Sequence, residues 1–185
     1  MNKRNLILLS FVLVAAAQLA APAWMIVDRE WTLREGRVFK FRTRPVDPVD
    51  AFRGRYVWLG LEPDTVRVPD TTNWRSNQKA FAVLGTDTNG FAIVKRLDRV
   101  QPAGEPAVPV YVTWPNAGTV HINWPGLDRF YMPEGKAPAA ETAYREHNRR
   151  ASQSCHVTVR VRGTHAVIEN LFIEDQPIRD WLRSH

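Results

Sequence analysis

The feature that most constrains this chain is an uncharged apolar run near its N-terminus, LILLSFVLVAAAQLAAPAWMIV, from Leu6 to Val27. At about 1.5 Å per residue, a helix over this run is about 33 Å long, which is enough to cross the hydrocarbon core of a bilayer. Lys3 and Arg4 precede the run, whereas mixed charge follows it at Asp28–Glu30. The positive-inside rule therefore predicts a cytoplasmic tip (1–5), a transmembrane signal-anchor (6–27) and an extracytoplasmic remainder.

The alternative for the same run is a cleaved signal peptide. Alanines at positions 15–17, 20, 21 and 23 could supply the small residues of a cleavage site. However, the apolar run continues through Trp24-Met25-Ile26-Val27, which makes it longer than the apolar region of a usual signal peptide. An indole at Trp24 also suits the membrane–water interface. These observations favour an uncleaved anchor that contacts membrane lipid.

Composition sets bounds on the rest of the chain. With 185 residues, 44% hydrophobic and 24% charged, the chain can build one globular domain, expected at 37–185 after a linker or helical extension at 28–36. The net charge of +6 is spread along the sequence without a basic cluster or motif, so we expect no nucleic-acid binding. The lone cysteine, Cys155, cannot form an intrachain disulfide, and its place in an alternating strand predicts a buried thiol.

The chain after the anchor has the pattern of antiparallel β structure. In Arg37–Arg44 the apolar residues Phe39 and Phe41 alternate with charged ones, as they do on a half-buried strand. Further strands are expected at 55–61, 79–84, 91–97, 108–114, 119–124, 155–162 and 166–173, and one helix at 138–150. Short strands at regular spacing predict a mainly β fold, a single antiparallel β-sandwich or partly open barrel with one helix.

The turn after the first strand holds the densest group of candidate site residues. Asp47 and Asp50 flank a proline and could bind a divalent cation or act in acid–base chemistry, although aspartate beside proline is also an ordinary turn former. Arg53 and Arg55 flank Gly54 and could hold a carboxylate or a phosphate. Equally, the two arginines could pair with the two aspartates.

Signatures of catalysis are absent from the sequence. The histidines have no metal-binding spacing, and neither a GxSxG elbow nor a glycine-rich phosphate loop occurs. We therefore expect no catalytic residues, no cofactor and no metal. Two alternatives remain open: an enzyme or ligand-binding domain with a polar cleft around Asp47, Asp50 and Lys95, and a module that binds lipid headgroups or the cell wall through surface arginines and tryptophans.

Two segments carry a resemblance to a known family. Pro45–Pro48, Phe52–Gly54, Tyr56 and Leu59 resemble the turn and the glycine-centred strand of the GDYXXLXY family. Arg55 stands where the family has aspartate, and Leu61 where it has the final tyrosine of the motif, so a role that needs that carboxylate is not expected here. Farther along, GLDRFYMPEG at 126–135 is similar to a second conserved segment of the family.

The resemblance implies a bacterial protein with a single N-terminal transmembrane segment. Because members of the family often accompany polytopic membrane proteins, it implies a non-catalytic accessory subunit of the inner membrane with a periplasmic domain. The residues expected to bind a ligand or partner are those of the two similar segments and one lysine. They are Asp47, Asp50, Arg53, Gly54, Arg55, Tyr56, Lys95, Asp128, Arg129 and Glu134.

A second resemblance, to bacterial signal peptidases, concerns the fold alone. These enzymes also carry a β-rich domain outside the membrane after an anchor, and Arg53-Gly54-Arg55 and Lys95-Arg96 stand at comparable places. Val46 to Arg53 contains no serine, so the nucleophile is missing and a serine–lysine mechanism is not expected.

Overall fold

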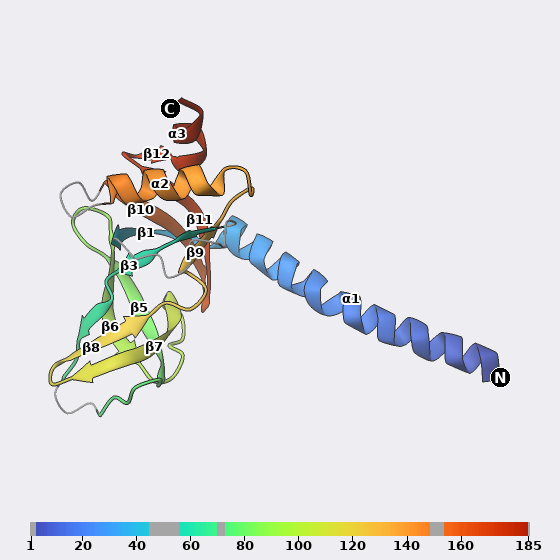
Figure 1. Ribbon diagram of the computed structural model, residues 1–185. Coiled ribbons are helices and arrows are strands. Elements are labelled where there is room, and N and C mark those ends of the chain that lie inside the picture. Colours follow the sequence, from blue (N-terminus) through green and yellow to red (C-terminus); the bar gives the residue numbers. More distant parts are fainter. Residues whose placement is uncertain (1–2, 45–55, 70–72, 149–153, 185) are drawn as a thin grey trace.

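The computed structural model describes residues 3–44, 56–69, 73–148 and 154–184 (Figure 1). Helix α1 (Lys3–Glu35) extends far out from a domain that is mainly β. Its apolar side chains are exposed on every side, with Phe11 70% and Met25 71% exposed. Among the described residues, α1 is the helix that is long and apolar enough to span a membrane. An apolar surface of this kind is stable in lipid rather than in water.

The first sheet contains the strands nearest to the anchor helix. Its five strands are β1 (Arg37–Arg44), β3 (Gly60–Glu62), β10 (Cys155–Arg162), β11 (His165–Ile173) and β12 (Gln176–Pro177), in the order β12-β11-β10-β1-β3. All neighbouring strands are antiparallel. Phe39 and Phe41 of β1 are 1% and 0% exposed, as their alternation with charged residues predicts.

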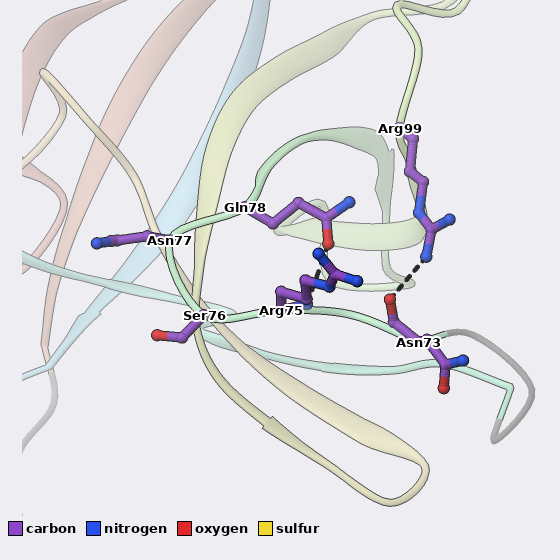
Figure 2. A pocket seen from close by; sticks show the side chains of 6 residues that line it. All are labelled: Asn73, Arg75, Ser76, Asn77, Gln78 and Arg99. Atoms are coloured by element: carbon purple, nitrogen blue, oxygen red, sulfur yellow. Dashed lines mark hydrogen bonds between the residues drawn. The ribbon is translucent and has the colours of Figure 1, made fainter.

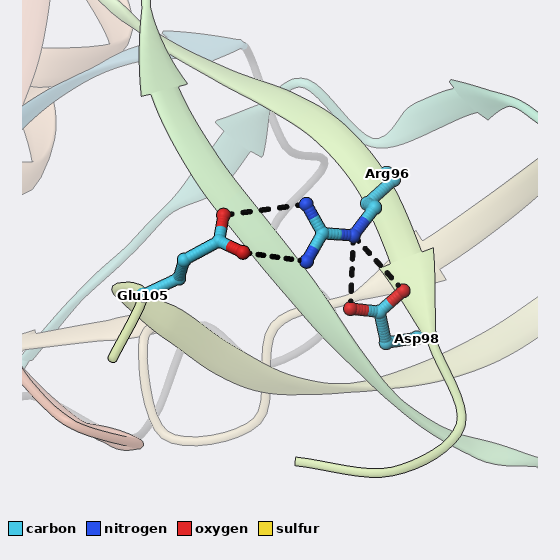
Figure 3. A network of polar contacts seen from close by, with 3 residues as sticks. All are labelled: Arg96, Asp98 and Glu105. Carbon is cyan, nitrogen blue, oxygen red and sulfur yellow. Dashed lines mark hydrogen bonds and ion pairs between the residues drawn. The ribbon is translucent and has the colours of Figure 1, made fainter. Parts of the chain in front are cut away.

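The second sheet is a nearly closed barrel. It consists of β4 (Thr65–Arg67), β5 (Lys79–Thr86), β6 (Ala92–Asp98), β7 (Ala107–Asn116) and β8 (Thr119–Asn123), in the order β4-β8-β7-β5-β6. The two edge strands, β4 and β6, come into contact. On β6, Arg96 bridges Asp98 and Glu105 at 3.0 and 2.8 Å (Figure 3). A charged network of this kind on an edge strand disfavours pairing with another chain.

A small third sheet and two helices complete the domain. β2 (Tyr56–Trp58) pairs with β9 (Arg129–Tyr131), and α2 (Ala137–His147) packs against β2. Together with α3 (Ile178–Ser184), α2 lies at the end of the domain opposite the second sheet (Figure 1). The Tyr144 ring of α2 is 2% exposed, and its hydroxyl donates a hydrogen bond of 3.1 Å to the carbonyl of Arg44. One core therefore joins α2 to the sheets.

The anchor helix continues into the domain without a loop. The segment expected as a linker or helical extension is helical as far as Glu35. Thr32 is fully buried, and a Cβ atom on Gly36 would lie only 2.4 Å from its carbonyl oxygen. Only glycine therefore fits where the helix passes into β1.

Strand β10 departs from its sequence pattern. Strict alternation with the buried Cys155 and Val157 would place His156 and Thr158 on the solvent side, yet each is only 7% exposed. A bulge between Thr158 and Val159 shifts the register with β11, so that His156 lies opposite Phe172. The His156 ring stacks on Phe172 at 4.7 Å and meets the edge of Phe91 at 6.0 Å. These rings cover the face that alternation alone assigns to solvent.

Candidate functional site

Strands β2 and β9 bring together two segments that lie far apart in the sequence. Tyr56 lies opposite Tyr131, Val57 opposite Phe130, and Trp58 opposite Arg129. The pairing continues past the strand end, where the Leu59 amide donates a hydrogen bond of 2.9 Å to the Asp128 carbonyl. This two-stranded ribbon therefore contains the center of each segment that resembles the GDYXXLXY family.

The two faces of the ribbon differ in character. On the inner face, Val57, Leu59 and Phe130 are 0%, 4% and 5% exposed and belong to the core. Because side chains alternate along a strand, the residues between them point outward. The outward set consists of Tyr56, Trp58, Arg129 and Tyr131, and we call these four residues the aromatic–arginine patch.

The guanidinium group of Arg129 lies among the rings of the patch. Its central carbon is 5.3 Å from the Tyr56 ring centroid and 4.9 Å from that of Trp58. Tyr56 meets Trp58 and Tyr131 edge to face, at centroid distances of 5.7 and 5.8 Å. Cation–π and edge-to-face contacts both stabilise such an arrangement, so the four side chains hold one another in place.

The positive charge of the Arg129 guanidinium is stabilised by neighbouring residues. A hydrogen bond with Tyr131, and secondly the negative charge of Asp128, raise the pKa of the Arg129 guanidinium. Nε of Arg129 lies 3.4 Å from a carboxylate oxygen of Asp128, a distance that suits an ion pair better than a hydrogen bond. An arginine is cationic at physiological pH in any case, and these neighbours stabilise the charge further.

The patch has the composition and the exposure of a recognition surface. Its side chains stay open to solvent, with Tyr131 55% exposed and the Arg129 side chain 40% exposed. Tyrosine, tryptophan and arginine are the residue types that contribute most binding energy at protein interfaces. A guanidinium held beside aromatic rings can bind a carboxylate, while the rings pack against an apolar or aromatic side chain.

The predicted site residues fall into three groups. Asp47, Asp50, Arg53, Gly54 and Arg55 lie outside the described residues. Tyr56, Asp128 and Arg129 come together at the patch.

The remaining two lie elsewhere. Lys95 is exposed on β6, and its side chain covers Gly85, where an added Cβ would lie 2.5 Å from the lysine Cε. Glu134 lies in an exposed turn before α2. Within the described part of the chain, no group of three or more His, Cys, Asp and Glu side chains could hold a metal ion.

Trp58 and Tyr131 were not selected as site residues from the sequence. The alternation of β2 places Trp58 on the same side as Tyr56, but nothing local to either segment indicates that β9 is its partner. The signal that could have revealed the patch is the outward alternation of aromatic residues in both segments, read together with an antiparallel pairing between them.

The comparisons with known proteins agree with this picture. No characterised protein of the curated set and no solved structure is significantly similar to this chain. A family model described as GDYXXLXY protein matches residues 18–171, which takes in the second half of α1, the ribbon and most of both sheets. In the motif of that family, Tyr56 holds the outward position on the patch and Leu59 the buried position in the core. The chain belongs to the GDYXXLXY family.

Proposed function

We propose that this protein is a non-catalytic accessory subunit of the bacterial inner membrane, anchored by α1 and bound through the aromatic–arginine patch to a polytopic membrane protein. The observation that carries the proposal is the pairing of β2 with β9. It joins both segments that resemble the family and presents three aromatic rings and one guanidinium on a single outward face.

The exposure of the patch supports a partner role. Single exposed aromatic residues are common on protein surfaces, whereas a cluster of aromatic rings around a charged guanidinium is typical of a binding surface. The rings already constrain the Arg129 side chain, so this side chain loses less conformational entropy when a partner binds it. Asp128 lies beside Nε of the guanidinium, and the terminal nitrogens of a guanidinium can donate to a second carboxylate, here one from a partner.

The attachment of the domain to its anchor supports a membrane partner. Helix α1 extends about 12 Å beyond Val27 before it ends at Glu35. Asp28 binds the β10–β11 turn through Arg162 and His165. The domain thus stays close to the bilayer, where it can meet the loops of a polytopic protein.

The orientation of the protein follows from the charges around the anchor. Lys3 and Arg4 favour an N-terminus in the cytoplasm, which places the β domain in the periplasm. A fusion of alkaline phosphatase to the C-terminus should then be enzymatically active in cells, and a matching fusion of green fluorescent protein should be dark. The reverse result would contradict the periplasmic location.

The partner role can be tested by photocrosslinking in cells. A photoreactive phenylalanine analogue at Tyr131, in the patch, should crosslink to an integral membrane protein. The same analogue at Val100, which is 78% exposed, serves as the control and should not yield that product. Arg129→Ala should abolish the crosslink from position 131. Absence of any membrane-protein product at 131, or the same product at 100, would refute the proposal.

The alternative of an enzyme with a polar cleft gains no support from Lys95. This lysine of β6 lies over Gly85 of β5. The next residue, Arg96, forms an ion pair with Glu105 (Figure 3). Arg96, through a hydrogen bond, and Lys95, through its charge, lower the pKa of the Glu105 carboxyl. Lys95 therefore contributes to the charged surface of an edge strand.

A further inference from the structure

Trp114 lies on the outer face of the barrel-like sheet and is 66% exposed. Val112 is fully buried, so strict alternation along β7 would also bury Trp114. Instead, a β-bulge between Val112 and Trp114 shifts the register and places Trp114 opposite His121. β-Bulges often re-aim a side chain next to a functional site. Trp124, which also precedes a proline, is 4% exposed and belongs to the core.

Trp114 borders an open hollow of about 530 Å³, a size that is common for ligand sites. The hollow lies between the end of β1, the loop before β4 and the strands β7 and β8. Its polar lining is formed largely by planar side chains, namely Arg44, Asp64, Asn116, His121 and Asn123.

Two contacts hold part of this lining in place. A guanidinium nitrogen of Arg44 lies 3.2 Å from a carboxylate oxygen of Asp64. Nδ1 of His121 lies 3.1 Å from the hydroxyl oxygen of Thr65. The two asparagine side chains each offer a donor and an acceptor in one plane. The hollow thus combines one broad aromatic face with paired donors and acceptors.

We propose that this hollow binds a saccharide, with the Trp114 indole against the apolar face of a pyranose ring. The C–H groups on that face carry partial positive charge and are attracted to the negative face of an indole. The hydroxyl groups at the ring edge would then exchange hydrogen bonds with Asn116, Asn123 and Asp64. Because the hollow is open, it suits a section of a longer glycan chain.

The charges of the lining favour an uncharged sugar. The positive charge of Arg44 is already balanced by Asp64, so this pair offers an anionic ligand little net positive charge. An apolar ligand would leave the amide and carboxylate groups without hydrogen bonds. A neutral polyhydroxylated ring with one apolar face satisfies both kinds of surface.

A second hollow nearby lacks these features. It is lined by Asn73, Arg75, Ser76, Asn77, Gln78 and Arg99 (Figure 2). Arg99 donates a hydrogen bond of 2.8 Å to the Asn73 carbonyl and lies over the Trp74 ring at 5.1 Å. Gln78 accepts a hydrogen bond from the Arg75 amide. These contacts stabilise the loop itself, and the described residues that line this hollow include no aromatic side chain.

The proposal can be tested on the full chain in a detergent without a sugar headgroup, because a glycosidic detergent would compete. The probes are three neutral tetrasaccharides: chitotetraose, cellotetraose and maltotetraose. Saturation-transfer NMR detects binding, and a titration gives the affinity. At least one probe should bind saturably, and Trp114→Ala should weaken its affinity at least tenfold. Trp114→Phe, which keeps an aromatic face, should retain most of the affinity.

Tyr131→Ala provides the matched control. Tyr131 is an exposed aromatic residue of the patch, so its loss should leave saccharide binding unchanged. Arg129→Ala, which should abolish the crosslink from position 131, should likewise leave saccharide binding unchanged. The two proposals are therefore separable. Failure of all three probes to bind more tightly than about 10 mM would overturn the saccharide site. An affinity unaffected by Trp114→Ala would do the same, and unchanged circular dichroism would show that the variant is folded.

Discussion

Asp28 of the anchor helix forms an ion pair with Arg162 of the β10–β11 hairpin, at 2.5 Å between the carboxylate and guanidinium groups. The second carboxylate oxygen lies 2.6 Å from Nδ1 of His165. The Arg162 guanidinium also covers the Trp31 ring at 5.1 Å. The end of the apolar helix is thereby fixed to the tip of the first sheet, which limits the angles between anchor and domain.

Asp28→Ala should loosen this junction. Without the carboxylate, Arg162 and His165 lose their shared partner, and hydrogen exchange should accelerate in 29–36 and 162–165. The loss in unfolding free energy should stay below about 1 kcal/mol because the pair is partly exposed. The check is hydrogen–deuterium exchange with mass spectrometry on the full chain in detergent. Glu30→Ala is the control, because Glu30 pairs with Arg34 within the helix. Equal exchange in both variants would contradict the prediction.

Cys155 should resist thiol reagents while the domain is folded. Its side chain is 3% exposed, and burial raises the pKa of its thiol to about 12, so almost no thiolate exists at neutral pH. It is the single cysteine of the chain, so its reaction is easily followed. Ellman's reagent should react only after denaturant is added. Val100→Cys, at a 78% exposed position, should add one fast-reacting thiol. Rapid reaction of the unmodified chain would contradict the buried placement.

Much of the fold could be predicted from local pattern. Strand β1 matches the expected bounds at both ends, because Phe39 and Phe41 alternate with charged residues. The prediction that Cys155 is buried is also confirmed, because this residue lies on the inward side of an alternating strand, β10. The helix expected at 138–150 is present as α2 (Ala137–His147), with a proline in its first turn.

Other features depend on contacts between distant segments. The patch requires the pairing of β2 with β9, and three-residue strands are too short to show a clear alternation. Trp114 and Trp124 occupy similar sequence contexts. However, a bulge in β7 exposes Trp114, whereas Trp124 is buried in the core. His156 is buried because the rings of Phe91 and Phe172, from two different hairpins, cover it. No local pattern carries this information.

The stability of the domain should fall in mild acid because of His156. Desolvation by burial lowers the pKa of its imidazole, and the charge of Lys40 acts in the same direction. Asp175, 3.8 Å away, acts in the opposite direction, and the nearby Arg42 is paired with Asp87. Since the folded pKa is below the unfolded value of about 6.5, the contribution of His156 is fully present above that pH. It is lost progressively as the pH falls toward and through the folded pKa.

His156→Phe should remove this part of the pH dependence. The variant keeps a ring between Phe91 and Phe172 but cannot take up a proton. Urea unfolding at pH 7.5 and at pH 5.5 measures the effect, and the midpoint should drop more in the unmodified chain than in the variant. An equal drop in both proteins would show that another group accounts for the acid sensitivity.

Leu61→Tyr, which restores the final residue of the family motif, should destabilise this chain. Leu61 is 4% exposed and lies opposite Thr43 in the first sheet. A tyrosine there must fit a larger ring and a hydroxyl group into a core shaped for leucine, at a cost of about 1–3 kcal/mol. Thermal unfolding followed by circular dichroism is the check. An unchanged or higher midpoint would mean that the core still accommodates the tyrosine of the family.

Arg129→Lys should weaken partner binding although the positive charge remains. A guanidinium is planar, lies close to the rings of Tyr56 and Trp58 and can bind a carboxylate with two parallel hydrogen bonds, whereas an ammonium group does neither as well. The yield of the crosslink from position 131 should therefore fall in Arg129→Lys nearly as far as in Arg129→Ala. Arg99→Lys is the matched control, because Arg99 also lies over a tryptophan, Trp74, but in the loops next to β5 and β6. A full crosslink yield in Arg129→Lys would show that charge alone is sufficient, and that the rings serve only to position it.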